Sequence, residues 1–189
     1  LVQLSNGYIC CTLRDDLLLE VKRLAEERRF DYLLIEGTGI AEPLPIAATF
    51  SFRDEAGVSL SDVAKLDTMV TVVDALSLLA DYSSRDLLRN RGELRDIYDQ
   101  RTLVDLLVSQ IEFADVVVIN KASDASEAAL EEIRKVIAAL NPRARQVETD
   151  FGKVPLKAII DTGLFDEAKA ATHPLWYKEL YSADSHMPE

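Results

Sequence analysis

The sequence predicts an α/β protein whose mostly parallel sheet is covered by helices on both faces. Two observations support this fold class. Short apolar runs without polar alternation, as expected of strands buried on both faces, alternate along the chain with amphipathic helical segments. Three of these runs also end at polar residues, as strands do when they deliver side chains to one edge of a sheet. The three runs are Tyr32–Ile35, Met69–Val73 and Val116–Ile119.

The first third of the chain predicts two strands and two helices. Residues 1–4 are expected to form a strand that is already under way, so we expect further residues in front of it. Thr12, with Asp15 three positions later, is typical of a helix N-terminus. That helix leads into the strand Tyr32–Ile35, and a short helix is expected over 46–52.

The remainder of the chain repeats the order of strand and helix. Leucine and isoleucine recur at helical spacing in two segments, and Pro142 ends the second of them. A polar, charged insertion over 75–100 separates the strand expected over 69–73 from the helix expected over 102–111. The elements expected here are a strand over 69–73, a helix over 102–111, a strand over 116–119, a helix over 126–140, a short strand over 145–148 and a short helix over 156–160.

Length, charge and cysteine content exclude several classes of protein. The 189 residues suit one domain with its own core. The formal net charge of −12 argues against a nucleic-acid partner, which needs clustered Lys and Arg. No apolar run approaches the roughly 20 residues that span a bilayer, so we expect no membrane segment. The two cysteines are adjacent and form no disulfide framework, which favours a reducing, cytoplasmic location.

Glu36 follows the first predicted strand directly, and Gly37 and Gly39 follow it. In phosphate-binding α/β proteins an acid at a strand end holds Mg²⁺ directly or through water. A glycine allows the backbone to approach a phosphate closely. Glu36 and Gly39 are therefore candidate catalytic residues. The alternative is a core strand followed by an ordinary glycine-containing turn.

Asn120 and Lys121 follow the strand Val116–Ile119 and begin a second candidate site. GTPases read guanine in this place with an Asn-Lys-x-Asp segment, whose carboxylate accepts from two N–H groups of the base. Here Ser123 stands at the position of that Asp, and Asp124 comes one residue later. Asn120, Lys121 and Asp124 are candidates for holding a base. The alternative is a strand-to-helix loop in which Ser123 or Asp124 is the helix N-cap.

Cys10 and Cys11 are candidate metal ligands, because thiolates bind Zn²⁺ strongly. Adjacent donors can share one metal only where the backbone bends between them. The alternative is a pair of buried or inert cysteines.

Several ordered segments together resemble the CobW family of P-loop metallochaperone GTPases, in the branch associated with zinc limitation. Asn6–Leu17 resembles the family's Gly-Cys-x-Cys-Cys segment, and Glu36–Pro43 resembles its Glu-(Ser/Thr)-(Ser/Thr)-Gly-x-(Ala/Ser)-(Glu/Asp)-Pro loop. The resemblance continues in the family's order through most of the chain. The further segments are Asp67–Ala75, Gln110–Lys121, Leu140–Ala144 and Asp161–Asp166.

The resemblance implies a P-loop NTPase-like fold that is incomplete at its N-terminus. Residues 1–165 would be part of a GTPase domain, and 166–189 a tail or linker toward a C-terminal domain. The implied function is a GTP-dependent metallochaperone, which binds a divalent metal such as zinc and couples its delivery to GTP hydrolysis. GTP, Mg²⁺ and Zn²⁺ are the implied ligands, and a client metalloprotein is the implied partner.

The resemblance also implies roles for the candidate residues. Glu36 would assist in positioning Mg²⁺ or water, and Gly39 would contact the γ-phosphate region. Asn120, Lys121 and Asp124 would hold the base. The loop after Glu36 would be ordered by nucleotide, as the switch segments of GTPases are.

The chain departs from the family pattern at three places that bear on these roles. It contains no Gly-x-x-Gly-x-Gly-Lys-(Ser/Thr) segment, whose amides and Lys hold phosphates in the family. Tyr8 stands where the family has its first cysteine, so Cys10 and Cys11 would need an outside ligand. Gly37 replaces a hydroxyl residue beside Glu36.

These departures leave two functions open. In one, the intact protein is a GTPase and this chain alone binds GTP poorly. In the other, the chain is a non-catalytic α/β module that binds metal or protein. Because a missing strand exposes the edges of its neighbours, we also expect a tendency to form homo-oligomers.

Overall fold

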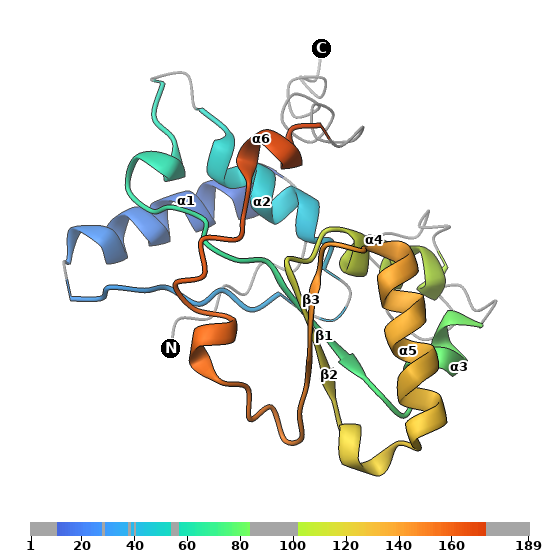
Figure 1. The fold of residues 1–189 in the computed structure, drawn as a ribbon. Coiled ribbons are helices and arrows are strands. Elements are labelled where there is room, and N and C mark those ends of the chain that lie inside the picture. Colours follow the sequence, from blue (N-terminus) through green and yellow to red (C-terminus); the bar gives the residue numbers. More distant parts are fainter. Residues whose placement is uncertain are drawn as a thin grey trace. The chain divides into compact units, whose positions relative to one another are not determined.

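The computed structural model describes residues 11–27, 29–37, 39, 41–53, 57–83 and 102–172 (Figure 1), with the backbone alone given for residues 11–16 and 18. These residues fall into two compact units, each with a core of its own. One unit takes the described residues of 1–39, 44–66 and 166–189. The other takes those of 40–43 and 67–165 and contains the sheet.

The sheet unit is built on three parallel strands, which confirms the predicted α/β class. The strands are β1 (Val70–Asp74), β2 (Val116–Asn120) and β3 (Arg145–Glu148), in the spatial order β1-β2-β3. Val118 pairs with Val72 on one side and with Val147 on the other, so β2 is the central strand. All four of its apolar residues are buried, as a continuous β-branched run predicts for a central strand.

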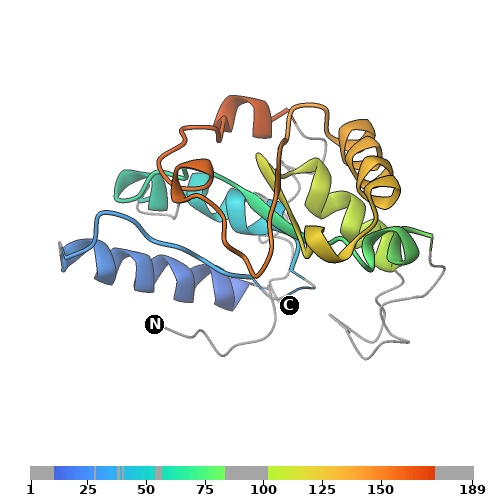
Figure 2. The same cartoon turned by 60° about the horizontal axis from the view of Figure 1, so that its bottom comes forward.

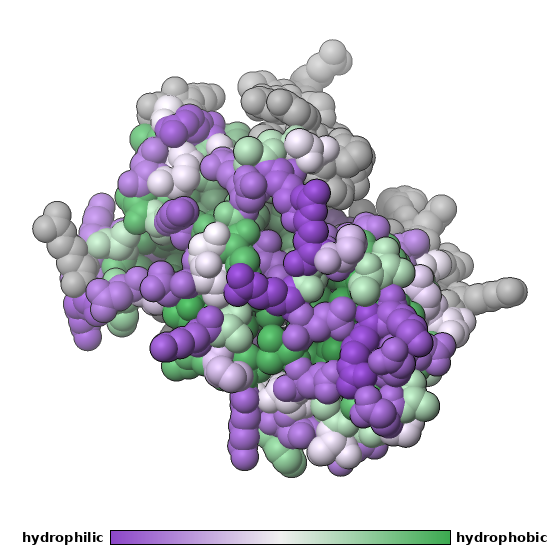
Figure 3. All heavy atoms as spheres, viewed as in Figure 1, coloured by the Kyte–Doolittle hydropathy of each residue, from purple (hydrophilic) through white to green (hydrophobic). Residues whose placement is uncertain are grey.

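Three helices of this unit lie together on the same side of the strands in both views (Figures 1 and 2). They are α3 (Leu78–Tyr82), α4 (Leu103–Glu112) and α5 (Glu127–Leu140). The apolar stripe of α5 is fully buried at Ile133 and Ile137 and packs with Val117 and Ile119 of β2. The opposite face of α5 is hydrophilic (Figure 3), so the predicted amphipathic helix is confirmed.

Side-chain caps begin α4 and α5 where the sequence has hydroxyl residues. The Thr102 hydroxyl accepts from the Asp105 N–H (3.1 Å), and the Asp105 carboxylate accepts from the Thr102 N–H (2.8 Å). This reciprocal pair is a capping box. The Ser126 hydroxyl accepts from the Ala129 N–H (3.2 Å) and caps α5. The expectation that Ser123 or Asp124 would cap this helix is therefore wrong.

Strand β1 is less buried than its apolar composition predicts. Val73 is buried, but Val72 is 64% exposed and Val70 is 37% exposed. This alternation shows that one face of β1 packs on the core while the other faces outward. The expectation that both faces of Met69–Val73 are buried is wrong for this strand.

The apolar run Tyr32–Ile35 forms no strand, which corrects the prediction. The backbone there is irregular, and all four of its side chains are exposed, Leu34 by 74%. A strand is stable only where a neighbour supplies N–H and C=O groups for a ladder. In the described part of the chain no strand pairs with this run. The run therefore lacks the hydrogen-bonding neighbour that a strand requires.

The remaining elements of the described chain are short, apart from α1. The small core of the first unit joins Leu17 and Val21 of α1 to Phe50 and Leu60. Predicted strand 1–4 and most of the insertion over 75–100 lie outside the described residues. The elements are α1 (Cys11–Glu26), α2 (Pro43–Ser51), η1 (Leu60–Asp62), η3 (Ala122–Asp124), η4 (Leu156–Ala158) and α6 (Glu167–Ala170).

Candidate functional site

The carboxyl ends of the three parallel strands place polar residues at one edge of the sheet. Asp74, the last residue of β1, pairs in register with Asn120, the last residue of β2. Glu148 ends β3 and leads into Thr149 and Asp150. Ligands of open parallel sheets bind beyond such strand ends, so this edge is the candidate site.

Lys121 is held in a defined place at this edge. Its backbone has φ of 60°, in the left-handed region, which few residues other than glycine, Asn or Asp adopt. Its ammonium donates to the Asp74 carboxylate across 2.5 Å. The two side chains come from the ends of neighbouring strands, so the pair ties the loop after β2 to the end of β1.

The loop after β3 fixes the other side of the Asn120 segment. The Gly152 N–H donates to the Asn120 side-chain oxygen (3.1 Å). The Ser123 N–H donates to the Asp150 carboxylate (3.0 Å), and the Ala122 N–H donates to the Thr149 carbonyl (3.1 Å). Two successive loops are thus joined by three hydrogen bonds, which pre-organise the edge.

Asp150–Gly152 is a segment of the candidate site that could not be identified from the sequence. Phe151 (φ 53°) and Gly152 (φ 66°) both adopt left-handed backbone conformations, which bend the chain sharply after β3. The signal in the sequence was a glycine shortly after a predicted strand, which marks a turn. It gave no indication of the partner of this turn, because Asp150 and Ser123 are 27 residues apart.

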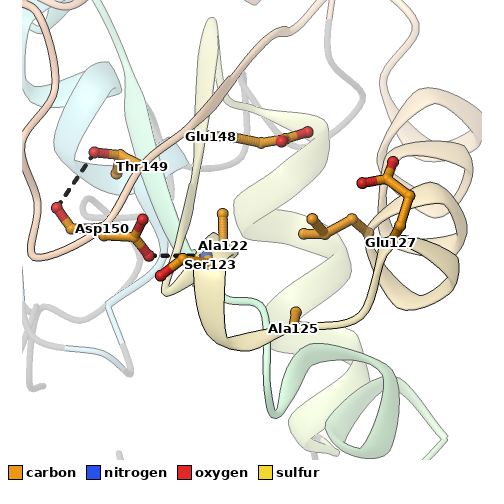
Figure 4. Close-up of a pocket in the computed structure, with 8 residues that line it drawn as sticks. Ala122, Ser123, Ala125, Glu127, Glu148, Thr149 and Asp150 are labelled. Carbon is orange, nitrogen blue, oxygen red and sulfur yellow. Dashed lines mark hydrogen bonds between the residues drawn. The ribbon is translucent and has the colours of Figure 1, made fainter.

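A shallow pocket of about 430 Å³ lies between these two loops (Figure 4). Ala122 of η3 and Glu127 at the start of α5 line one side of it, and Glu148 and Asp150 line the other. Its size falls in the range of pockets that bind small molecules. Its lining contains carboxylates and small apolar groups, and no Lys or Arg.

The Asp74–Lys121 ion pair gives the site a dependence on pH. The bond from Lys121 and a second one from the Leu76 N–H hold the pKa of the Asp74 carboxyl below its ordinary value of 3.8. A carboxyl whose pKa is lower in the folded state than in the unfolded state stabilises the folded state. This stabilisation is complete at pH values above the pKa of the unfolded state. The contribution is lost as the pH falls below about 3.8 toward the folded value.

We expect Lys121→Met to lower the free energy of unfolding by about 0.2–1 kcal/mol at pH 7, since both side chains are partly exposed. The difference from wild type should shrink as the pH falls below 3.8, because the unfolded chain then binds a proton at Asp74 that the folded ion pair still excludes. Urea unfolding at pH 7 and pH 3 measures both values. Lys157→Met, at an exposed residue, is the control. A difference that stays the same at both pH values would contradict the pair's role.

The other predicted site residues lie in the first unit or outside the described residues. Glu36 is exposed. A Cβ added to Gly39 would meet no atom within 4 Å, so no packing contact requires glycine there. Cys10 lies outside the described residues, and Cys11 is the first residue of α1, without a described side chain.

No group of three His, Cys, Asp or Glu side chains that could hold a metal ion occurs among the described residues. The same part of the chain contains no helix that is long and apolar enough to cross a membrane.

Together, the parallel sheet and its helices have the arrangement of a P-loop NTPase-type fold, and the joined loops at the carboxyl edge of the sheet form the candidate site. A family model for the CobW/HypB/UreG nucleotide-binding domain matches residues 1–148. The chain belongs to this family, which confirms the resemblance in its sequence.

Three similar proteins carry names that bear on function. Zinc-regulated GTPase metalloprotein activator 1 of Dictyostelium discoideum is 49% identical over 100% of this chain and 39% of its own length. The protein of the same name from Schizosaccharomyces pombe is 32% identical over 81% of this chain and 32% of its own length. The Zn(II)-bound YjiA GTPase from E. coli has a TM-score of 0.57 at 29% identity, covering 82% of this chain and 41% of that structure. The chain thus spans less than half the length of these relatives.

Proposed function

We propose that this chain is part of a GTP-dependent metallochaperone that binds zinc and couples its delivery to GTP hydrolysis. The observation that carries the proposal is the joined pair of loops at the carboxyl edge of the sheet, in the place where GTPases hold the base. Membership of the CobW/HypB/UreG family supports it. The names of the relatives, which are zinc-regulated GTPase metalloprotein activators and a Zn(II)-bound GTPase, support zinc as the cargo.

In this proposal each loop has a separate task. The Asn120–Lys121 segment binds the base, and its bonds to Gly152 and Asp74 keep it in place before the nucleotide arrives. Glu36 helps to hold Mg²⁺ or to orient the attacking water, and Gly39 lies near the γ-phosphate. Magnesium, when bound, would neutralise the charge that develops on the phosphates.

Cys10 and Cys11 carry the zinc in this proposal. Thiolates bind the metal and thiols do not, so binding releases protons and the affinity should fall in acid. Tyr8 provides no thiolate, so a third ligand would come from outside the Cys10–Cys11 pair. The recipient of the zinc is a client metalloprotein, to which the metal passes when GTP is hydrolysed in the cytoplasm.

We expect a Cys10→Ser/Cys11→Ser variant to lose one high-affinity zinc site, because it lacks both thiolates of the chain. Zinc titration against a competing chelator measures affinity and stoichiometry. The matched control is His173→Ala/His186→Ala, which removes both histidines of the chain and should bind zinc as wild type does. Equal zinc affinity and stoichiometry in the serine variant and wild type would refute the assignment.

A second candidate function is a module that binds metal or protein without catalysis. The observation in its favour is that the chain contains no P-loop motif. An assay of GTP and ATP hydrolysis by the full-length protein separates the two functions. The metallochaperone hydrolyses GTP in preference to ATP, and the non-catalytic module hydrolyses neither.

A further inference from the structure

The segment that would read the base lacks its acidic residue at the expected position. Ser123 stands there, and its hydroxyl cannot accept two N–H groups as a carboxylate does. Asp124 is the nearest acidic residue in the sequence. In the structure it is exposed at the end of η3 and does not line the pocket.

Asp150 places a carboxylate beside Ser123, the position at which an aspartate is expected. Its Oδ1 atom accepts a hydrogen bond of 3.0 Å from the backbone N–H of Ser123, and the side chain points toward the Ser123 segment (Figure 4). An ionised carboxylate has about four acceptor positions. The bond to Ser123 uses one of them and fixes the orientation, which leaves acceptor capacity on both oxygens.

Asp150 also differs from the other two acidic residues of the pocket. Arg134 pairs with Glu127 (2.8 Å) and with Glu148 (2.6 Å). Asp150 forms no ion pair with any residue in the described ranges. A carboxylate that is oriented and not neutralised by a cation attracts N–H donors, whereas it repels phosphate. Ala122, Ala125 and Leu130 add apolar surface for the faces of a ring.

We propose that Asp150 is the residue that reads the guanine base, taking the place of the aspartate that is absent at position 123. Its carboxylate accepts from N1–H and from the exocyclic amino group of guanine. Asn120 and Lys121, which lie beside the pocket and not among its lining residues, hold the same base from the end of β2 and the residue after it. Adenine has no N1–H and is rejected. This inference rests on the proposed function, because it assigns a specificity residue within the proposed GTP site.

Asp150→Asn tests the assignment. The amide oxygen of Asn still accepts from the Ser123 N–H, so the loop keeps its hydrogen bond. The amide nitrogen then faces the amino group of guanine, donor against donor, but it matches the C2 carbonyl of xanthine. We expect this variant to lose roughly tenfold or more in GTP affinity and to gain a similar factor for XTP, the range of a two-bond base contact.

The affinities are measured on the full-length protein by competition with a fluorescent GDP analogue. Glu132→Gln, at an exposed residue of α5 outside the pocket, is the control and should bind GTP and XTP as wild type does. Asp124→Asn tests the other acidic residue near the expected position. The gain of XTP binding requires a folded site, so it cannot result from unfolding.

The other outcomes contradict the proposal in different ways. A switch to XTP in Asp124→Asn in place of Asp150→Asn would identify Asp124 as the base reader. Weaker GTP binding in Asp150→Asn without a gain for XTP would reduce Asp150 to a loop-positioning residue. Wild type that binds no GTP at all would overturn the proposed function itself, and this inference with it.

Discussion

Replacing Asn141 with alanine is expected to lower the free energy of unfolding by about 2–4 kcal/mol, because three carbonyls at the end of α4 lose one largely buried donor group together. The Asn141 side-chain nitrogen donates to the carbonyls of Ile111 (2.9 Å), Glu112 (3.1 Å) and Ala114 (2.8 Å). Those carbonyls lie at and just beyond the C-terminus of α4, where helical carbonyls have no partner within the helix. Asn141 itself is only 7% exposed, so water does not replace it readily.

Chemical denaturation of wild type and variant measures this loss. Asn141→Asp keeps the shape of the side chain but places oxygens against three carbonyls, so we expect it to be at least as destabilising as alanine. Lys135→Ala, at the exposed face of the adjoining helix α5, should change the stability by less than about 0.5 kcal/mol. If Asn141→Ala is as stable as Lys135→Ala, the bonds of Asn141 do not hold α4 in place.

The sheet unit was largely predictable from the sequence, because its signals are local. The apolar spacing of 126–140 predicted α5, and the β-branched run at 116–119 predicted the central strand β2. Pro142 and the hydroxyl residues marked helix ends within a few positions. These elements carry their own pattern, and the tertiary structure agrees with it.

The failures occurred where a local pattern needs a distant partner. Tyr32–Ile35 has the composition of a buried strand, yet no strand in the described part of the chain pairs with it. Val72 has a β-branched side chain suited to a core, but it lies on the outward face of β1. Composition predicts that a segment can form a strand, whereas pairing and burial depend on what lies beside it.

The candidate site likewise contains residues that a local pattern identified and residues whose place depends on a distant partner. Asn120 and Lys121 were identified because they follow a recognisable strand, and the structure places them beside Asp74. Asp150 was missed because its link to Ser123 depends on the parallel pairing of β2 with β3, which brings two distant loops together. The roles of all the site residues stay predictions: Asn120, Lys121, Asp124, Glu36, Gly39, Cys10 and Cys11.

Zinc affinity is expected to differ by roughly tenfold or more between the GTP-bound and GDP-bound forms of the protein, which corresponds to about 1.4 kcal/mol of coupling. A metallochaperone that delivers zinc on GTP hydrolysis must bind zinc unequally in the two states. By the same linkage, zinc must change the ratio of the GTP and GDP affinities by the same factor. The Cys10→Ser/Cys11→Ser variant should show no such difference, because it lacks the coupled site.

The coupling of GTP to zinc is tested most sharply by titrating zinc into the full-length protein, in the presence of a non-hydrolysable GTP analogue and then of GDP. We expect two zinc affinities that differ by roughly tenfold or more, and no difference in the double-serine variant. The same zinc affinity with both nucleotides, at saturating nucleotide, would contradict the coupling of GTP to zinc.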